Sequence, residues 1–131
     1  AAEWYLKAAM RGALEAQVNL GICYNQGLGV PQDYAEAVKW FASAAEADHP
    51  AGKMNLAISY YEGEGVEQNK EKAVALLTEA AEFMPDAQFL LAQCYANGEG
   101  TAQDTAKAKE LYQQAADAGV VEAKEALEEL E

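Results

Sequence analysis

One phrase of eleven residues occurs three times in this chain at nearly constant spacing. It reads LGICYNQGLGV over residues 20–30, LAISYYEGEGV over 56–66 and LAQCYANGEGT over 91–101, so successive copies begin 36 and then 35 residues apart. Self-similarity at a period of about 20–50 residues is typical of a solenoid or array, in which each unit packs on its neighbours. The 131-residue chain is therefore predicted to contain three full repeats.

Each repeat is predicted to hold two helices. The first helix of the first full repeat runs over 14–26, because Ala16, Leu20 and Tyr24 fall on one helical stripe. Gly27 follows at the place where a helix end favours a left-handed residue. We call this first helix of a repeat helix A and the second helix B.

Helix B is predicted to begin after Asp33, a residue type that caps helix N-termini. Glu36 stands three residues later and completes the pattern of a capping box. Asn69 and Asp104 occupy the same cap position in the next two repeats. Helices A and B are predicted to approach closely at positions held by small residues, because larger side chains there would overpack. The small residues are Gly21, Ala57 and Ala92 on helix A and Ala44, Ala80 and Ala115 on helix B.

The motif A-x3-L-G-x2-Y-x2-G-x-G-V-x2-D-x3-A-x2-W-x3-AA, read from Ala16 to Ala45, resembles the Sel1-like repeat, a relative of the tetratricopeptide repeat. The resemblance implies an all-α fold, a right-handed α/α superhelical solenoid of antiparallel helix pairs. We expect one solenoid over 1–131, with its parts in this order: helix B of a partial repeat over 1–12, repeats over 13–48, 49–84 and 85–119, and a terminal capping helix over 120–131.

The resemblance also implies a function, that of an adaptor or scaffold that binds a protein or peptide on the concave face lined by the A helices. By position, the partner-binding residues are expected to be Val18, Ile22, Asn25, Met54, Ile58, Tyr61, Phe89 and Gln93. Apolar residues on an exposed concave face would form a groove. The alternative is that Val18, Met54 and Phe89 pack between adjacent A helices and are covered.

The excess of acidic residues limits the classes of partner that the chain can be expected to bind. The formal net charge is −13, from 22 acidic and 9 basic residues, and no basic cluster exists for nucleic acid or an anionic membrane. No apolar run reaches the ~18–20 residues that would span a bilayer, so no membrane insertion is expected. A partner with basic residues would suit the acidic terminal helix, although acidic surface also keeps a protein soluble. That helix carries Glu122, Glu125 and Glu129.

Catalysis is not expected from this sequence, and neither is a cofactor or a metal. The single histidine, His49, has no cysteine or second histidine at ligand spacing. Cys23 and Cys94 are predicted to be separate, mostly buried thiols, because two steps between stacked helices exceed the reach of a disulfide. The cysteine pair per repeat of the Helicobacter-type branch of the family is absent, so its disulfides are not expected. Unpaired thiols and the absence of a visible secretory signal favour a cytoplasmic location.

Self-assembly is the alternative function. The partial first repeat leaves one face of its helix without a helix A partner. Trp4, Tyr5 and Met10 on that helix could meet a second copy, which would give a homodimer.

Overall fold

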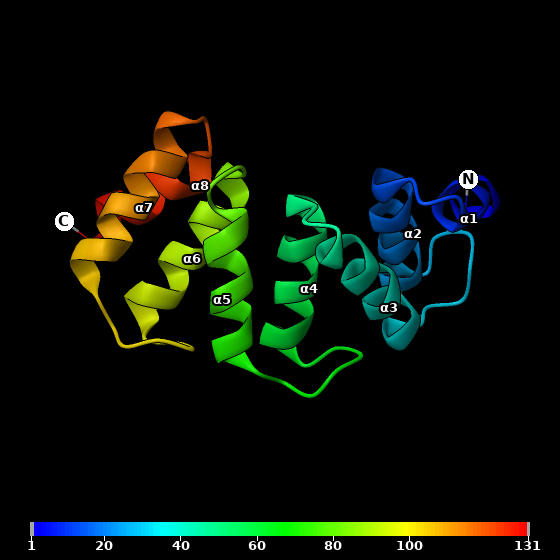
Figure 1. Ribbon diagram of the computed structural model, residues 1–131. Coiled ribbons are helices and arrows are strands. Elements are labelled where there is room, and N and C mark those ends of the chain that lie inside the picture. The colour runs from blue at the N-terminus through cyan, green and yellow to red at the C-terminus, as the bar shows by residue number, and fades with distance from the viewer. Residues whose placement is uncertain (1, 131) are drawn as a thin grey trace. The chain divides into compact units, whose positions relative to one another are not determined.

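The computed structural model describes residues 2–130 of the chain and the side chains of residues 3–130. Over this range it contains eight α-helices and no strand, in the order predicted (Figure 1). None of these helices is both long and apolar enough to cross a bilayer. The helices are α1 (Ala2–Met10), α2 (Leu14–Gln26), α3 (Tyr34–Glu46), α4 (Pro50–Glu62), α5 (Lys70–Ala80), α6 (Pro85–Asn97), α7 (Thr105–Asp117) and α8 (Val121–Leu130).

The helices form two compact units, one with α1–α4 that ends at Gln68 and one with α5–α8 that begins at Asn69. Within each unit, helices that are consecutive in sequence pack on one another. In the first unit α2 also contacts α4, so the A helices of two successive repeats are neighbours there.

The cores depend on small residues, as the sequence predicted. The alanines on the inner faces of the B helices have no exposed surface, which lets the next helix approach closely. In the first unit Ala9, Ala16 and Leu20 form a buried cluster, against which the larger rings of Tyr24 and Trp40 pack. The fully buried alanines of the B helices are Ala37, Ala44, Ala73, Ala80, Ala108 and Ala115.

The predicted N-caps of the B helices are confirmed, but the predicted capping box of Asp33 and Glu36 does not form. The Oδ1 atom of Asp33 accepts a hydrogen bond from the backbone N–H of Glu36 at 3.1 Å, and Asn69 and Asp104 cap α5 and α7 in the same way. A capping box also needs the Glu36 side chain to accept the N–H of Asp33. That N–H instead donates to the carbonyl oxygen of Tyr24 at 2.8 Å, so the chain's own backbone fills the place of the glutamate.

Each unit has a polar contact, here called a joint, between successive repeats. In the first unit Glu64 accepts a hydrogen bond from the side chain of Tyr34, at the start of α3, and this bond raises the pKa of Tyr34. In the second unit the Nζ atom of Lys70, at the start of α5, lies 2.8 Å from Oε2 of Glu99. In both joints an acidic side chain from the inter-helix loop of one repeat binds the first turn of the preceding helix B.

The turn between α5 and α6 differs from its counterparts: α5 has 11 residues where α3 and α7 have 13, and four residues (81–84) rather than three lead into the next helix. The other turns place Gly12, Asp48 or Gly119 in the left-handed region, at φ of 90°, 62° and 103°. In the turn between α5 and α6 the N–H of Met84 donates to the carbonyl of Ala80 at 3.0 Å, and no residue of the turn has positive φ. The side chain of Phe83 in this turn is left 69 % exposed.

Candidate functional site

The first unit contains five of the residues predicted to bind a partner. Ile22 and Asn25 lie on α2, Met54, Ile58 and Tyr61 lie on α4, and all five side chains are half-buried. Because α2 and α4 contact each other, these side chains belong to two adjacent helices. We call this set of five residues the A-helix face.

Val18, the sixth predicted residue of this unit, is only 6 % exposed. Its side chain belongs to the buried set of α2, together with Ala16 and Leu20. A residue so covered offers a partner very little surface, so we leave Val18 out of the A-helix face.

The second unit holds the last two predicted residues, Phe89 and Gln93, on α6. Both are half-buried. The ring of Phe89 lies 5.8 Å from the ring of Tyr112 on α7, at a tilt of 55°, which is within the range of favourable aromatic contact. Phe89 therefore packs on the helix B of its own repeat, and part of its ring is taken up by that contact.

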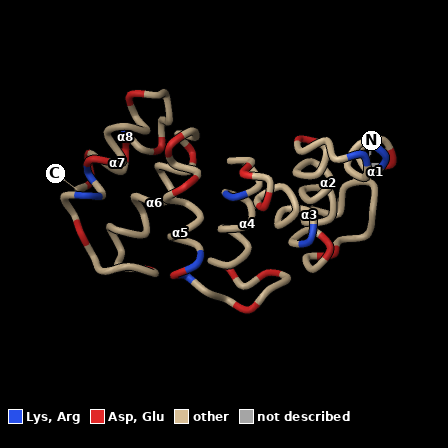
Figure 2. Tube along the Cα trace, viewed as in Figure 1, with Lys and Arg blue, Asp and Glu red and all other residues tan. Residues whose placement is uncertain are grey.

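The charge distribution is acidic in both units (Figure 2). At the end of α4 the side chain of Glu62 shares a hydrogen bond with Glu64, and this bond, then burial and the charge of Glu64, raise the pKa of Glu62. The predicted acidic helix is also present, since Glu122, Glu125 and Glu129 on α8 are all exposed. The structure therefore has acidic groups at the end of α4, next to Tyr61, and along α8.

Glu62→Gln is expected to stabilise the protein at neutral pH and to have less effect in acid. A raised pKa in the folded state favours folding below the pKa of the unfolded carboxyl, near 4.5, and this contribution is lost as pH rises through the folded value. At pH 7 the substitution should raise the free energy of unfolding by about 0.2–0.5 kcal/mol, because the pair is largely solvated. Urea unfolding at pH 4 and pH 7 measures the difference. Glu46→Gln is the control for the change in net charge. If it raises the free energy of unfolding as much as Glu62→Gln does at each pH, the effect comes from net charge and not from the contact between Glu62 and Glu64.

Both cysteines are free and buried, as predicted. Burial, followed by the charge of Glu99, raises the pKa of Cys94 to about 11, while Lys70 opposes the rise. Residues 3–130 contain no group of three or more histidine, cysteine or acidic residues placed to hold a metal ion. The half-buried His49 stands at the N-cap of α4 and makes no capping hydrogen bond through its side chain.

In a Cys23→Ser variant, Cys94 is expected to resist a disulfide reagent at pH 8 until the protein is unfolded. With a pKa of about 11, only about one thiol in a thousand is the reactive thiolate at that pH. The free energy of unfolding should hold below pH 9 and fall as pH rises toward 11, because the folded state favours the neutral thiol. Immediate reaction in native buffer, at the rate seen in urea, would contradict this burial.

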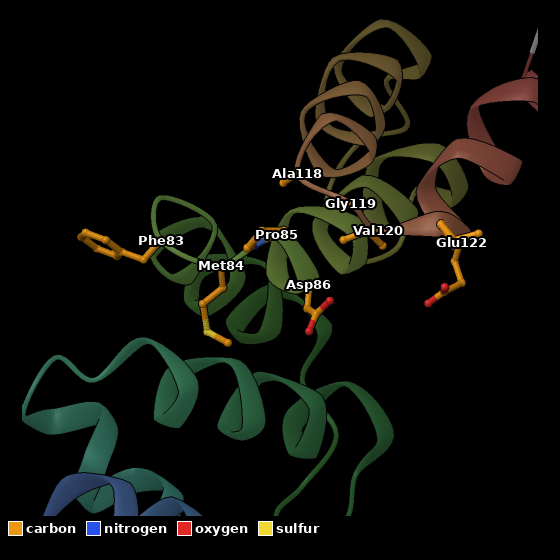
Figure 3. Close-up of a pocket in the computed structure, with 9 residues that line it drawn as sticks. Phe83, Met84, Pro85, Asp86, Ala118, Gly119, Val120 and Glu122 are labelled. Atoms are coloured by element: carbon orange, nitrogen blue, oxygen red, sulfur yellow. The ribbon is translucent and has the colours of Figure 1, made fainter.

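A pocket that the sequence did not reveal lies in the second unit. It has a volume of about 550 Å³ and is formed by the turn that leads into α6 and the turn that leads into α8. Figure 3 shows Pro85 and Val120 between the two turns, Asp86 and Glu122 on the same side in this view, and Phe83 extending outward at one end. We call it the turn pocket; its lining residues are Phe83, Met84, Pro85, Asp86, Ala118, Gly119, Val120, Val121 and Glu122.

One signal in the sequence could have indicated the turn pocket. The turns before α2 and α4 carry small or polar residues, Gly12 and Ala13 in one and Asp48 and His49 in the other. The turns before α6 and α8 carry an apolar residue directly before the helix, which is Met84 in one and Val120 in the other. Phe83 adds a second apolar residue to the turn before α6.

Comparison with known sequences identifies one repeat type along nearly the whole chain. The profile described as the Sel1 repeat matches residues 1–12, 14–49, 50–82 and 85–120. A search of curated protein sequences finds no significant match.

Solved structures similar to this chain include those of three bacterial proteins. A protective antigen of uropathogenic Escherichia coli strains, which displays an SLR fold, is 38 % identical with a TM-score of 0.88; the match covers 92 % of this chain but 26 % of that one. A Sel1 repeat protein from Oxalobacter formigenes is 33 % identical with a TM-score of 0.82, and 95 % of each chain is covered. Cysteine rich protein B of Helicobacter pylori, at 18 % identity and a TM-score of 0.74, covers 95 % of this chain and 90 % of its own, and shows the fold alone.

Proposed function

This chain belongs to the Sel1 repeat family, whose members are generally protein-interaction modules, and we propose that it is an adaptor that binds a protein or peptide on the A-helix face. The family is typically a non-catalytic fold, and our proposal assigns this chain binding rather than catalysis. Its solenoid class is that of the similar structures.

The observation that carries the proposal is the partial exposure of apolar side chains on two neighbouring helices. Ile22 on α2 and Met54 and Ile58 on α4 remain half-buried, while the core residues of the same helices are almost fully covered. Apolar surface that stays accessible to water is stabilised when a partner covers it. Asn25 and Tyr61 add polar groups that could orient the bound segment.

The partner suited to this face carries apolar side chains and some basic residues. Glu62 is the last residue of α4 and follows Tyr61, and Glu64 stands two residues later. The two carboxyl groups are close enough to each other to share a hydrogen bond. A lysine or arginine of the partner near this pair would relieve the repulsion between the two carboxylates, which favours binding and guides orientation.

The test compares partner capture by the intact chain and by a Met54→Glu/Ile58→Glu variant. Placing two carboxylates in the face should abolish capture of a partner that the intact chain retains, and a Leu28→Glu variant should retain it, because Leu28 is 52 % exposed and lies outside the face. Circular dichroism checks that all three proteins are equally helical. Equal capture by the face variant and the intact chain would rule out the A-helix face as the binding site.

A second candidate function is self-association through α1. Trp4 and Met10 are 68 % and 74 % exposed on this helix. Tyr5, which was expected to share this role, instead packs against the buried cluster around Leu20. Sedimentation across a concentration series should then show a dimer that Trp4→Ser weakens, and a monomer at every concentration would contradict self-association.

A further inference from the structure

We propose that the turn pocket is a second docking site, and that it binds a segment of another protein in which one large apolar side chain stands next to a lysine or arginine. The proposal rests on residues that are separate from the A-helix face, so it can hold or fail independently of that face.

The pocket gathers apolar surface that the fold itself leaves uncovered. Phe83 and Val121 are 69 % and 64 % exposed, and both line it. Pro85 and Val120 add further apolar groups between the two turns (Figure 3), and Met84 also lines the pocket. Its volume of about 550 Å³ is in the range of pockets that hold drug-sized ligands, which leaves room for an apolar side chain together with a neighbouring residue. Such surface in a solvated turn marks an interaction site rather than a core.

Two of these apolar residues stand where a helix favours a polar one. Met84 precedes the first residue of α6 and makes no side-chain cap, and Val120 precedes the first residue of α8. Serine, threonine, aspartate and asparagine are preferred at this position, because their oxygens accept the free N–H groups of the first turn. The corresponding residues before α2 and α4, Ala13 and His49, make no side-chain cap either, but they are not large and apolar. Capping therefore does not explain Met84 and Val120, whereas an apolar ligand does.

The charges that line the turn pocket favour a basic residue next to the apolar side chain of the bound segment. Asp86 and Glu122 each occupy the first turn of a helix and line the pocket, and none of the described residues that line it is basic. The chain as a whole carries a formal net charge of −13. A segment with a lysine or arginine beside its apolar side chain would complement these carboxylates, and an acidic segment would be repelled.

The direct test is a titration of the ¹⁵N-labelled chain with a short probe peptide, acetyl-Gly-Lys-Leu-Lys-Gly-amide, followed by nuclear magnetic resonance. Saturable shifts are expected at the backbone amides of residues 83–87 and 118–123, except at Pro85, which has no amide proton. Two matched peptides separate the contributions. Replacing both lysines by glutamate, or the leucine by serine, should each weaken binding by at least about 10-fold, because either change removes one of the two proposed complementarities.

Variants of the pocket keep the fold and remove its apolar surface. The Met84→Ser/Val120→Ser variant should bind the probe peptide at least about 10-fold more weakly than the intact chain. The urea midpoint of this variant should equal or exceed that of the intact chain, because serine is a preferred cap. Asp86→Asn/Glu122→Gln should weaken binding by about 3–10-fold and remove most of its salt dependence. Leu28→Ser, an exposed apolar position outside the pocket, should leave the affinity unchanged.

A third pocket variant, Phe83→Ser, tests the pocket at an exposed position that is not a helix cap, and it should weaken binding by at least about 3-fold. The proposal is overturned if millimolar peptide gives no saturable shift, if the shifts lie elsewhere, or if the pocket variants bind the peptide as well as the intact chain. It is also overturned if the same amides shift with protein concentration in the absence of peptide and sedimentation shows a dimer, because the occupant is then a second copy of this chain.

Discussion

Gly100→Ala is expected to lower the free energy of unfolding by about 2–5 kcal/mol. Gly100 lies in the loop before α7 with φ of 76°, a region that costs alanine about 1–2 kcal/mol. An added Cβ atom would also lie 2.6 Å from the carbonyl carbon of Lys70 and even closer to its oxygen. These are backbone atoms in the first turn of α5, so neither can rotate away, and overpacking adds about 1–3 kcal/mol. Urea unfolding monitored by circular dichroism measures the loss.

Gly98→Ala is the matched control for this prediction. Gly98 ends α6 at φ of 67°, so alanine meets the same backbone strain. Its nearest neighbour would be the Cβ atom of Gln103 at 3.3 Å, a side-chain contact that a small shift relieves. The control should therefore lose about 1–2 kcal/mol. Equal losses from the two substitutions would show that the loop does not press on α5, and that the joint at Lys70 and Glu99 is not close-packed.

Phe41→Ala is expected to lower the free energy of unfolding by about 3–5 kcal/mol, because it leaves a cavity in the core of the first unit. Phe41 is 1 % exposed. Its ring lies over Gly21 on α2, where an added Cβ atom would come within 2.5 Å of the ring edge. The absence of a side chain at Gly21 therefore makes room for the ring.

The same pair of residues predicts a reversal of sign. In the intact chain Gly21→Ala should destabilise the protein by about 1–2 kcal/mol, since the clash with Phe41 outweighs the better helix propensity of alanine. In the Phe41→Ala background the added methyl group has space, so Gly21→Ala should stabilise by about 1 kcal/mol. A double-mutant cycle by urea unfolding measures both. The same sign in both backgrounds would mean that Phe41 and Gly21 do not share this contact.

Local rules within a repeat were enough to predict two helices per repeat, the bounds of α2 and the cap residues of the B helices. Asp33, Asn69 and Asp104 cap the B helices because a short polar side chain just before a helix can accept a free N–H of its first turn. The one local error concerned Glu36, whose expected hydrogen-bond partner, the N–H of Asp33, donates to the carbonyl of Tyr24 instead. That bond joins the end of helix A to the start of helix B, and a pattern of capping residues alone does not reveal it.

The exposure of individual side chains was harder to predict. Val18, Met54 and Phe89 occupy the same position in three repeats, yet Val18 is buried, Met54 is half-buried and Phe89 packs on Tyr112. Exposure depends on how closely the neighbouring helices approach, and the repeat pattern is nearly the same in all three copies. The turn pocket was missed for a related reason, because it joins two turns that are far apart in the sequence.

The measurement that most directly tests the proposed adaptor function is site-specific photo-cross-linking in cells. In one variant of the chain a photoreactive phenylalanine analogue replaces Ile58, in the A-helix face. In a second variant of the chain it replaces Leu28, outside both proposed sites. The account predicts a discrete cross-linked protein from position 58 that is absent from position 28 and is lost when Met54→Glu is added. Cross-linking from position 28 alone, or from position 58 regardless of Met54→Glu, would contradict the assignment of partner binding to this face.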